Sequence, residues 1–219
     1  MFIINCKNYE EIAGEKILKF VNIAQSISKK YKVPIAVAPP QHLVGLVSKS
    51  SIPIFAQHVD VSKIGSTTGF VVPELLKKSG VKGSLINHSE HRISSKEIEA
   101  LVLKLRELKM VSVLCVKDVA EAKKYSKLNP DFIAIEPPEL IGSGKAVSKE
   151  RPELITKAVK AVQNSKGNTK LLCGAGIVSG EDVSAAIRLG SEGILVASGI
   201  IKAKSWKKII EDFAKSMKK

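Results

Sequence analysis

Charged side chains stand directly after several short apolar runs of this chain, in positions where they could do chemistry. Lys7 follows the first run, His88 and Glu90 follow the fourth, and Glu136 follows the sixth. A carboxylate can take a proton from carbon, and an imidazole or an ammonium can stabilise the negative charge that then develops on oxygen. These residue types therefore indicate acid–base chemistry on an anionic substrate.

Glu136 has the weakest purely structural explanation among them. It lies in FIAIEPPELIGSGKA, residues 132–146, between an apolar run and two prolines that lead into a glycine-rich tail. A carboxylate carried into apolar surroundings is costly unless it has a partner. By contrast, His88 alone could be a hydrogen-bonded core histidine, and Lys7 with Glu90 could be an ion pair that closes one end of a barrel.

Two glycine-rich segments look like nucleotide-binding motifs but fail on their spacing. GSGKA, residues 142–146, lacks the first glycine and the following Ser or Thr of a P-loop. GAGIVSG, residues 174–180, has Ser179 where the third glycine of a dinucleotide fingerprint should fall. Small residues still let backbone N–H groups approach an anion, so these turns predict a phosphate site without a nucleotide. We expect neither a metal ion nor an organic cofactor.

The elements that must position these residues alternate along the chain. Eight short apolar runs are typical of buried strands: residues 2–4, 35–38, 54–56, 84–86, 112–115, 132–135, 171–173 and 194–196. Amphipathic segments separate most of them, and a capping box at Ser94 and Glu97 and prolines at Pro73 and Pro152 mark helix starts. The pattern predicts an α/β fold, a single (β/α)8 barrel over residues 1–219; an open doubly wound sheet is the alternative.

Composition agrees with a single compact unit. The chain has 219 residues, of which 44% are hydrophobic, so it can bury one core without disulfides or structural metals. The first residues, MFIIN, do not resemble a signal peptide, and no apolar run approaches the ~20 residues that a bilayer needs. We therefore expect a soluble cytoplasmic protein whose three cysteines, Cys6, Cys115 and Cys173, are free thiols.

The charge is strongly positive, with 35 Lys and Arg against 21 Asp and Glu, a formal net charge of +14. Such a balance raises nucleic acids, membrane surfaces and anionic small molecules as partners. Many lysines occur in pairs along amphipathic segments, and aromatic residues make up only 5% of the chain, which is little material for base stacking. We expect a small anionic substrate and no nucleic-acid or membrane partner.

Three segments carry a resemblance to a known family. NCK at residues 5–7, NHSEHR at 87–92 and EPPELIGSGK at 136–145 resemble, in order, the signature segments of the triosephosphate isomerase family. The segments AQHVD, GSTTG, CGAGI and ILVASG are similar to further loops of that family, so the resemblance covers essentially the whole chain. The short length, and Ala197-Ser198 where many members have two glycines, resemble the archaeal-type branch.

The resemblance implies a TIM barrel that interconverts dihydroxyacetone phosphate and D-glyceraldehyde 3-phosphate in glycolysis and gluconeogenesis, without a cofactor. Glu136 would be the base, His88 the electrophile, and Lys7 the fixed positive charge. Asn5 would be a hydrogen-bonding neighbour in the catalytic set. Supporting roles would fall to Glu90, which would orient Lys7, and to Ser89, which would hold Glu136 while the loop is open.

The resemblance also implies a substrate-binding set and a subunit contact. The substrate-binding residues would be Asn5, Cys6, Lys7, Ile141, Gly142, Gly176, Ala197 and Ser198. Thr68, in the loop that contains GSTTG, would reach into a neighbouring subunit of a homo-oligomer, for which a tetramer is favoured over a dimer.

Four departures from the family pattern are visible. Cys6 stands where a Trp is common, Gly176 where many members have Ser, and Phe70 where an acid is usual, while Pro138 and Glu139 replace a more apolar hinge. Two other functions stay open at this point: another phosphate-handling barrel, such as an epimerase or lyase, and a basic nucleic-acid-binding module.

Overall fold

Eight parallel strands form the barrel in a computed structural model, which describes residues 1–142, 144–165 and 167–217. The strands are β1 (Phe2–Asn5), β2 (Ile35–Ala38), β3 (Phe55–Ala56), β4 (Gly83–Ile86), β5 (Val111–Val116), β6 (Phe132–Ile135), β7 (Lys170–Gly174) and β8 (Gly193–Val196). Their order is β2-β1-β8-β7-β6-β5-β4-β3, and an isolated parallel bridge between Val37 and Ile54 joins the two ends. The fold is therefore a single (β/α)8 TIM barrel, and the open-sheet alternative is wrong.

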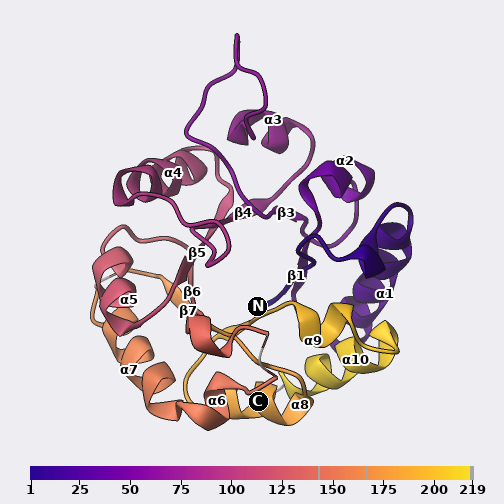
Figure 1. The fold of residues 1–219 in the computed structure, drawn as a ribbon, viewed down its shortest axis with the longest axis vertical. Coiled ribbons are helices and arrows are strands. Elements are labelled where there is room, and N and C mark those ends of the chain that lie inside the picture. The colour runs from indigo at the N-terminus through magenta and orange to yellow at the C-terminus, as the bar shows by residue number, and fades with distance from the viewer. Residues whose placement is uncertain (143, 166, 218–219) are drawn as a thin grey trace.

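Helices surround this sheet on the outside, as Figure 1 shows. The α-helices are α1 (Lys16–Tyr31), α2 (Val44–Val47), α3 (Pro73–Lys78), α4 (Ser95–Glu107), α5 (Val119–Ser126), α6 (Val147–Glu150), α7 (Pro152–Gln163), α8 (Gly180–Arg188), α9 (Ser198–Ile201) and α10 (Trp206–Ser216). Short 3-10 turns occur at η1 (Glu10–Ile12), η2 (Gln41–Leu43) and η3 (Pro138–Leu140). Several helices have only one turn, which lets 219 residues complete a barrel.

The predicted helix starts are confirmed by the local structure. Ser94 accepts a hydrogen bond from the N–H of Glu97, and the Glu97 side chain accepts one from the N–H of Ser94, so α4 begins with a complete capping box. Pro73 and Pro152 begin α3 and α7, where a missing N–H costs nothing. The third strand is shorter than expected, because Ile54 makes only the isolated bridge to Val37.

Alternation along each strand divides the core into two parts. Ile3, for example, points into the barrel, whereas Phe2 and Ile4 pack outward against the helices. The buried interior consists of Ile3, Ala36, Ala38, Phe55, Leu85, Val113, Cys115, Ala134, Leu172 and Leu195. Large and small side chains thus fill the interior together, so the barrel is packed and substrate can bind only at its ends.

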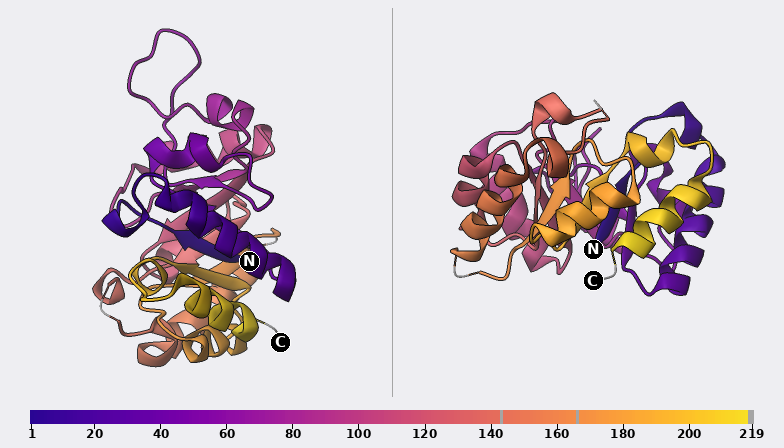
Figure 2. Two further views of the ribbon diagram at one scale, coloured as in Figure 1. Left: turned by 90° about the vertical axis from the view of Figure 1, so that its right-hand side faces the viewer. Right: turned by 90° about the horizontal axis from the view of Figure 1, so that it is seen from below.

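The connection between β3 and α3 extends away from the barrel, at the top of Figure 1 and in the left view of Figure 2. It exposes Val61, Ile64 and Phe70, each about half accessible to solvent. Among the described residues, no helix has the length and apolar character needed to cross a bilayer.

Candidate active site

The carboxyl ends of the strands bring Lys7, His88 and Glu136 together. Lys7 has a left-handed backbone with φ of 46°, which is unusual for a residue with a side chain. Two hydrogen bonds hold it there: its N–H donates to Oδ1 of Asn5 at 3.0 Å, and Nε2 of Gln57 donates to its carbonyl oxygen at 3.0 Å. Asn5 and Gln57 therefore fix the direction in which the Lys7 side chain leaves the backbone.

The Lys7 ammonium makes an ion pair with Glu90. Nζ of Lys7 lies 2.8 Å from Oε1 of Glu90, and the Lys7 side chain is 12% exposed against 59% for Glu90. The positive charge is thus the more buried of the two. The expected contact between these residues is present.

His88 is held in one tautomer. The N–H of Glu90 donates to Nδ1 of His88 at 3.2 Å. Because Nδ1 accepts a hydrogen bond, a neutral imidazole carries its proton on Nε2. Nε2 lies 3.6 Å from Oε2 of Glu136, longer than a hydrogen bond. His88 can therefore offer an N–H to a substrate oxygen beside the carboxylate.

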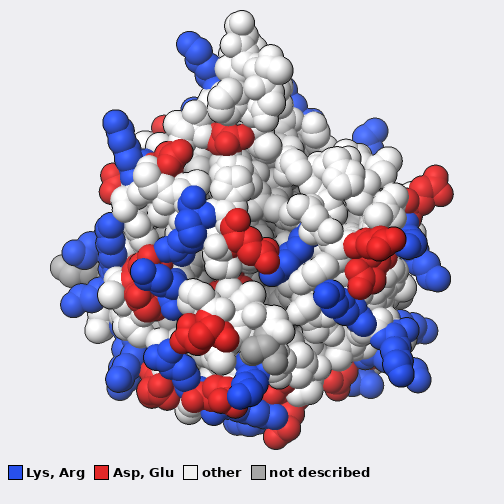
Figure 3. All heavy atoms as spheres, in the orientation of Figure 1, with Lys and Arg blue, Asp and Glu red and all other residues white. Residues whose placement is uncertain are grey.

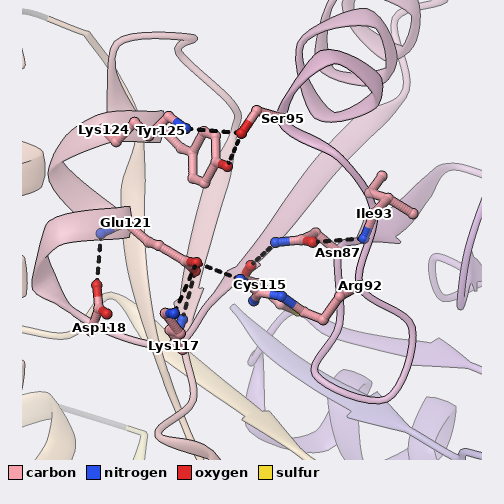
Figure 4. A network of polar contacts seen from close by, with 10 residues as sticks. All are labelled: Asn87, Arg92, Ile93, Ser95, Cys115, Lys117, Asp118, Glu121, Lys124 and Tyr125. Carbon is pink, nitrogen blue, oxygen red and sulfur yellow. Dashed lines mark hydrogen bonds and ion pairs between the residues drawn. The ribbon is translucent and has the colours of Figure 1, made fainter.

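Behind His88, a polar network fixes the loop that carries it. Asn87 has φ of 60°, donates through Nδ2 to the carbonyl oxygen of Cys115 at 3.1 Å, and accepts at Oδ1 from the N–H of Ile93 at 3.1 Å. Arg92 makes an ion pair with Glu121 on α5. Figure 4 shows these contacts joining the loop after β4 to β5 and α5. The loop is therefore tied down on both sides of its histidine.

Glu136 is buried at the end of β6, with 7% of its surface exposed. Its N–H donates to the carbonyl oxygen of Val116 at 2.9 Å, which continues the sheet up to the carboxylate. Oε2 has no hydrogen-bond partner within the described part of the chain. A buried carboxylate oxygen without a partner is costly, and that cost is typical of a group kept for binding or catalysis.

Small and sulfur-containing residues make the space for this carboxylate. A Cβ on Gly174 would lie 2.5 Å from Cγ of Glu136, so only glycine fits beside it. Burial raises the pKa of the Cys115 thiol well above its ordinary value, and the neighbouring Glu136 carboxylate raises it further. Both observations place Glu136 against the ends of β5 and β7, with little freedom to move sideways.

A cavity of about 320 Å³ opens beside Glu136. Its walls include Lys7 and five of the expected phosphate-binding residues: Ile141, Gly142, Gly176, Ala197 and Ser198. Gly176 has φ of 69°, and a Cβ there would collide with the carbonyl oxygen of Lys145, where the loop after β6 returns to the barrel. A second cavity, of about 500 Å³, continues from Lys7 past Asn5 and His88 to Gln57 and His58.

Three expected residues line neither of these two cavities. Cys6 is fully buried in the core between strands and helices, and its N–H bonds to Ala38. Ser89 has a buried hydroxyl without a hydrogen-bond partner among the described residues, and it is not bonded to Glu136. Thr68 is exposed on the β3–α3 connection. Ser143, which belongs to the GSGK segment, lies outside the described residues.

Several residues of the site carry no clear signal in the sequence. Tyr9 and Lys202 line the 320 Å³ cavity, and Gly174 makes room for Glu136. Gln57 stands at the end of the third apolar run, but nothing in the sequence indicates that its amide binds the backbone of Lys7. Over the ranges that are described, no three His, Cys, Asp or Glu side chains are arranged to hold a metal ion.

A TIM barrel whose mouth joins a buried carboxylate, an imidazole and an ammonium to a glycine-lined cavity belongs to the class of acid–base enzymes for small anionic substrates. The comparisons with known proteins narrow this class. The family model described as triosephosphate isomerase matches residues 1–213. The chain therefore belongs to the triosephosphate isomerase family, and it is an isomerase.

Individual relatives support the same assignment. The chain is 56% identical to the triosephosphate isomerase of Cenarchaeum symbiosum, over 99% of this chain and 97% of the relative. It is 44% identical to that of Methanothermus fervidus, over 99% and 98%, and 43% identical to that of Methanocaldococcus jannaschii, over 98% and 99%. These organisms agree with the archaeal-type resemblance, and they favour triose phosphate isomerisation over the epimerase, lyase and nucleic-acid-binding alternatives.

Proposed function

We propose that Glu136 is the base with which this isomerase interconverts dihydroxyacetone phosphate and D-glyceraldehyde 3-phosphate. The observation that carries the proposal is its buried carboxylate, whose Oε2 lacks a hydrogen-bond partner among the described residues and faces His88. The base takes a proton from the hydroxymethyl carbon beside the carbonyl and returns it to the former carbonyl carbon, while the hydroxyl proton passes from one oxygen to the other. An enediolate forms between the two steps.

His88 and Lys7 stabilise the charge of that enediolate. The neutral imidazole donates from Nε2 to the substrate oxygen, and the Lys7 ammonium adds a positive charge that Glu90 orients. A carboxylate base beside a neutral imidazole is the arrangement established for this family. Asn5 contributes by holding the backbone of Lys7.

The phosphate group binds in the 320 Å³ cavity. Backbone N–H groups of Ile141, Gly142, Gly176, Ala197 and Ser198 bind its oxygens. The glycines support this role because they leave the backbone uncovered at the cavity wall. The side chain of Cys6 contributes to packing, and only the backbone of Cys6 takes part in substrate binding.

The loop from Glu136 to Ala146 acts as a lid. Pro137 and Pro138 stiffen its first part, and η3 places Leu140 in a buried position. Ser89 holds Glu136 when the lid is open. Closing the lid excludes water, which protects the enediolate from losing its phosphate.

Residues 1–219 act as one domain in the cytoplasm, in glycolysis and gluconeogenesis, and no metal or organic cofactor takes part. The exposed apolar side chains of the β3–α3 connection, together with Thr68, support burial of that loop against a second subunit. A homotetramer is favoured over a dimer. Lys and Arg residues spread around the rim in Figure 3 and alternate with Asp and Glu, which supports a small-molecule substrate more than a nucleic acid.

A coupled assay with dihydroxyacetone phosphate tests the proposal. We expect the Glu136→Gln variant to lose at least about 100-fold in kcat, since a positioned base contributes 10²- to 10⁴-fold. Lys7→Ala should also lose activity, whereas Glu107→Gln, an exposed change of the same kind on α4, should keep it. Wild-type turnover by a folded Glu136→Gln protein would refute the assignment.

A further inference from the structure

Lys202 lies at the phosphate end of the active site. It directly follows α9, and its side chain lines the 320 Å³ cavity together with Gly176, Ala197 and Ser198. Its Nζ lies 4.7 Å from the centre of the Tyr9 ring, and Tyr9 lines the same cavity from the loop after β1. Two loops from neighbouring strands thus hold an ammonium at the rim of the cavity.

The charge of Lys202 is not neutralised by a nearby carboxylate. Among the described residues, no Asp or Glu oxygen lies within ion-pair distance of its Nζ, whereas Lys7 is paired with Glu90 and Lys149 is paired with Glu181 and Asp182. The aromatic face of Tyr9 attracts a cation but carries no net charge. The full positive charge of Lys202 therefore remains available at the cavity.

The other groups at this end of the site leave a need for that charge. The expected phosphate-binding groups are backbone N–H groups, and Gly176 has no side chain to add a donor. Lys7 also lines this cavity, but its ammonium is bonded to Glu90. Among the described residues that line this cavity, Lys202 is thus the cation without an ion pair, and hydrogen bonds to charged groups are the stronger ones.

We propose that Lys202 is a further substrate-binding residue, which pairs with the phosphate group while Tyr9 holds its ammonium at the cavity rim in the free enzyme. The proposal rests on the proposed phosphate site. Lysine has a flexible four-carbon stem and a compact charge. It can therefore turn from the ring toward the phosphate without moving the backbone of α9. Tyr9 keeps the ammonium near the cavity beforehand, which lowers the entropy lost on binding.

Steady-state kinetics of the Lys202→Gln variant test this role. Loss of a charge-assisted contact should lower kcat/KM by about 10-fold or more, mainly through a higher KM, because the phosphate contact is made equally in the bound substrate and in the transition state. Inhibition by inorganic phosphate should weaken by a similar factor. Lys202→Arg, which keeps the charge, should lose less than Lys202→Gln in both measurements.

Lys204 provides the matched control. It lies two residues further along the chain, and its change to Gln removes the same charge. Lys204 lines a neighbouring cavity with Trp206 and Lys207, and unlike Lys202 it does not line the 320 Å³ cavity. Lys204→Gln should leave the KM and the phosphate inhibition constant unchanged. If both variants behave alike, or if Lys202→Gln keeps wild-type constants, Lys202 does not bind the phosphate and the proposal is overturned.

Tyr9 variants test the second half of the proposal. Tyr9→Phe keeps an aromatic face and should raise the KM less than Tyr9→Leu does. Adding Lys202→Gln to Tyr9→Leu should then cost less than Lys202→Gln costs alone. Fully additive losses would overturn the proposed partnership. If the wild type is inactive and does not bind phosphate, the proposed function itself is refuted. If the wild type is active but its kinetic constants do not depend on Lys202, only the proposed role of Lys202 is refuted.

Discussion

A single methyl group on Gly174 should displace Glu136, the proposed base. Gly174 has no left-handed backbone, so alanine can adopt its conformation. The added Cβ would lie 2.5 Å from Cγ and 3.0 Å from Cδ of Glu136, while carbon atoms pack at about 3.5 to 4.0 Å. The Glu136 side chain must therefore move by about 1 Å. A misplacement of that size costs about 100-fold in rate, or about 2.7 kcal/mol of activation free energy.

The coupled triose phosphate assay would measure this loss as kcat of Gly174→Ala. Inhibition by inorganic phosphate reports on the other end of the site and should change little. Gly45→Ala is the control, because Gly45 lies in α2 and its added Cβ would meet no atom within 4 Å. A folded Gly174→Ala protein with wild-type kcat would refute the account of how β7 positions Glu136.

Two further predictions concern stability. Hydrogen bonds from Lys30 and then Tyr31 lower the pKa of Glu211 from its ordinary value of 4.5 to about 2. This contact therefore stabilises the fold above pH 4.5 and is lost as the pH falls toward 2. Thermal melts should show a higher Tm for wild type than for Glu211→Gln at pH 6, and a difference that persists unchanged at pH 2 would contradict this. Ser94→Ala removes the capping box of α4 and should lower the free energy of unfolding by about 1 kcal/mol in urea titrations, whereas no change would mean that the cap is not needed.

The sequence predicts the barrel because local signals agree with the tertiary structure. Apolar runs on both faces mark strands that are covered inside and outside, and capping residues mark where α4, α3 and α7 begin. The third strand is the exception. Phe55 and Ala56 form the third strand, whereas Ile54 makes an isolated bridge to β2. Whether Ile54 joins the strand depends on its pairing with β2 and not on its own apolar character.

The candidate site is predictable only where a residue type indicates chemistry. Glu136, His88 and Lys7 stand out because charged groups at strand ends are unusual. Gly174 carries no such signal, since its requirement comes from the Glu136 side chain on the neighbouring strand.

The contact between Tyr9 and Lys202 could not be predicted from the sequence either, since the two residues are far apart in the chain. They meet only because β1 and β8 are adjacent in the barrel. Closure of the barrel therefore brings together the parts of the site that the spacing of residues in the sequence does not indicate.

Proton exchange at carbon tests the central claim most directly. Dihydroxyacetone phosphate in D2O, followed by 1H NMR, should exchange a carbon-bound proton for deuterium with the wild-type enzyme, because a carboxylic acid formed at Glu136 exchanges with solvent. Folded Glu136→Gln should show almost no exchange while it still binds inorganic phosphate. Exchange at the wild-type rate by Glu136→Gln would contradict the assignment of Glu136 as the base.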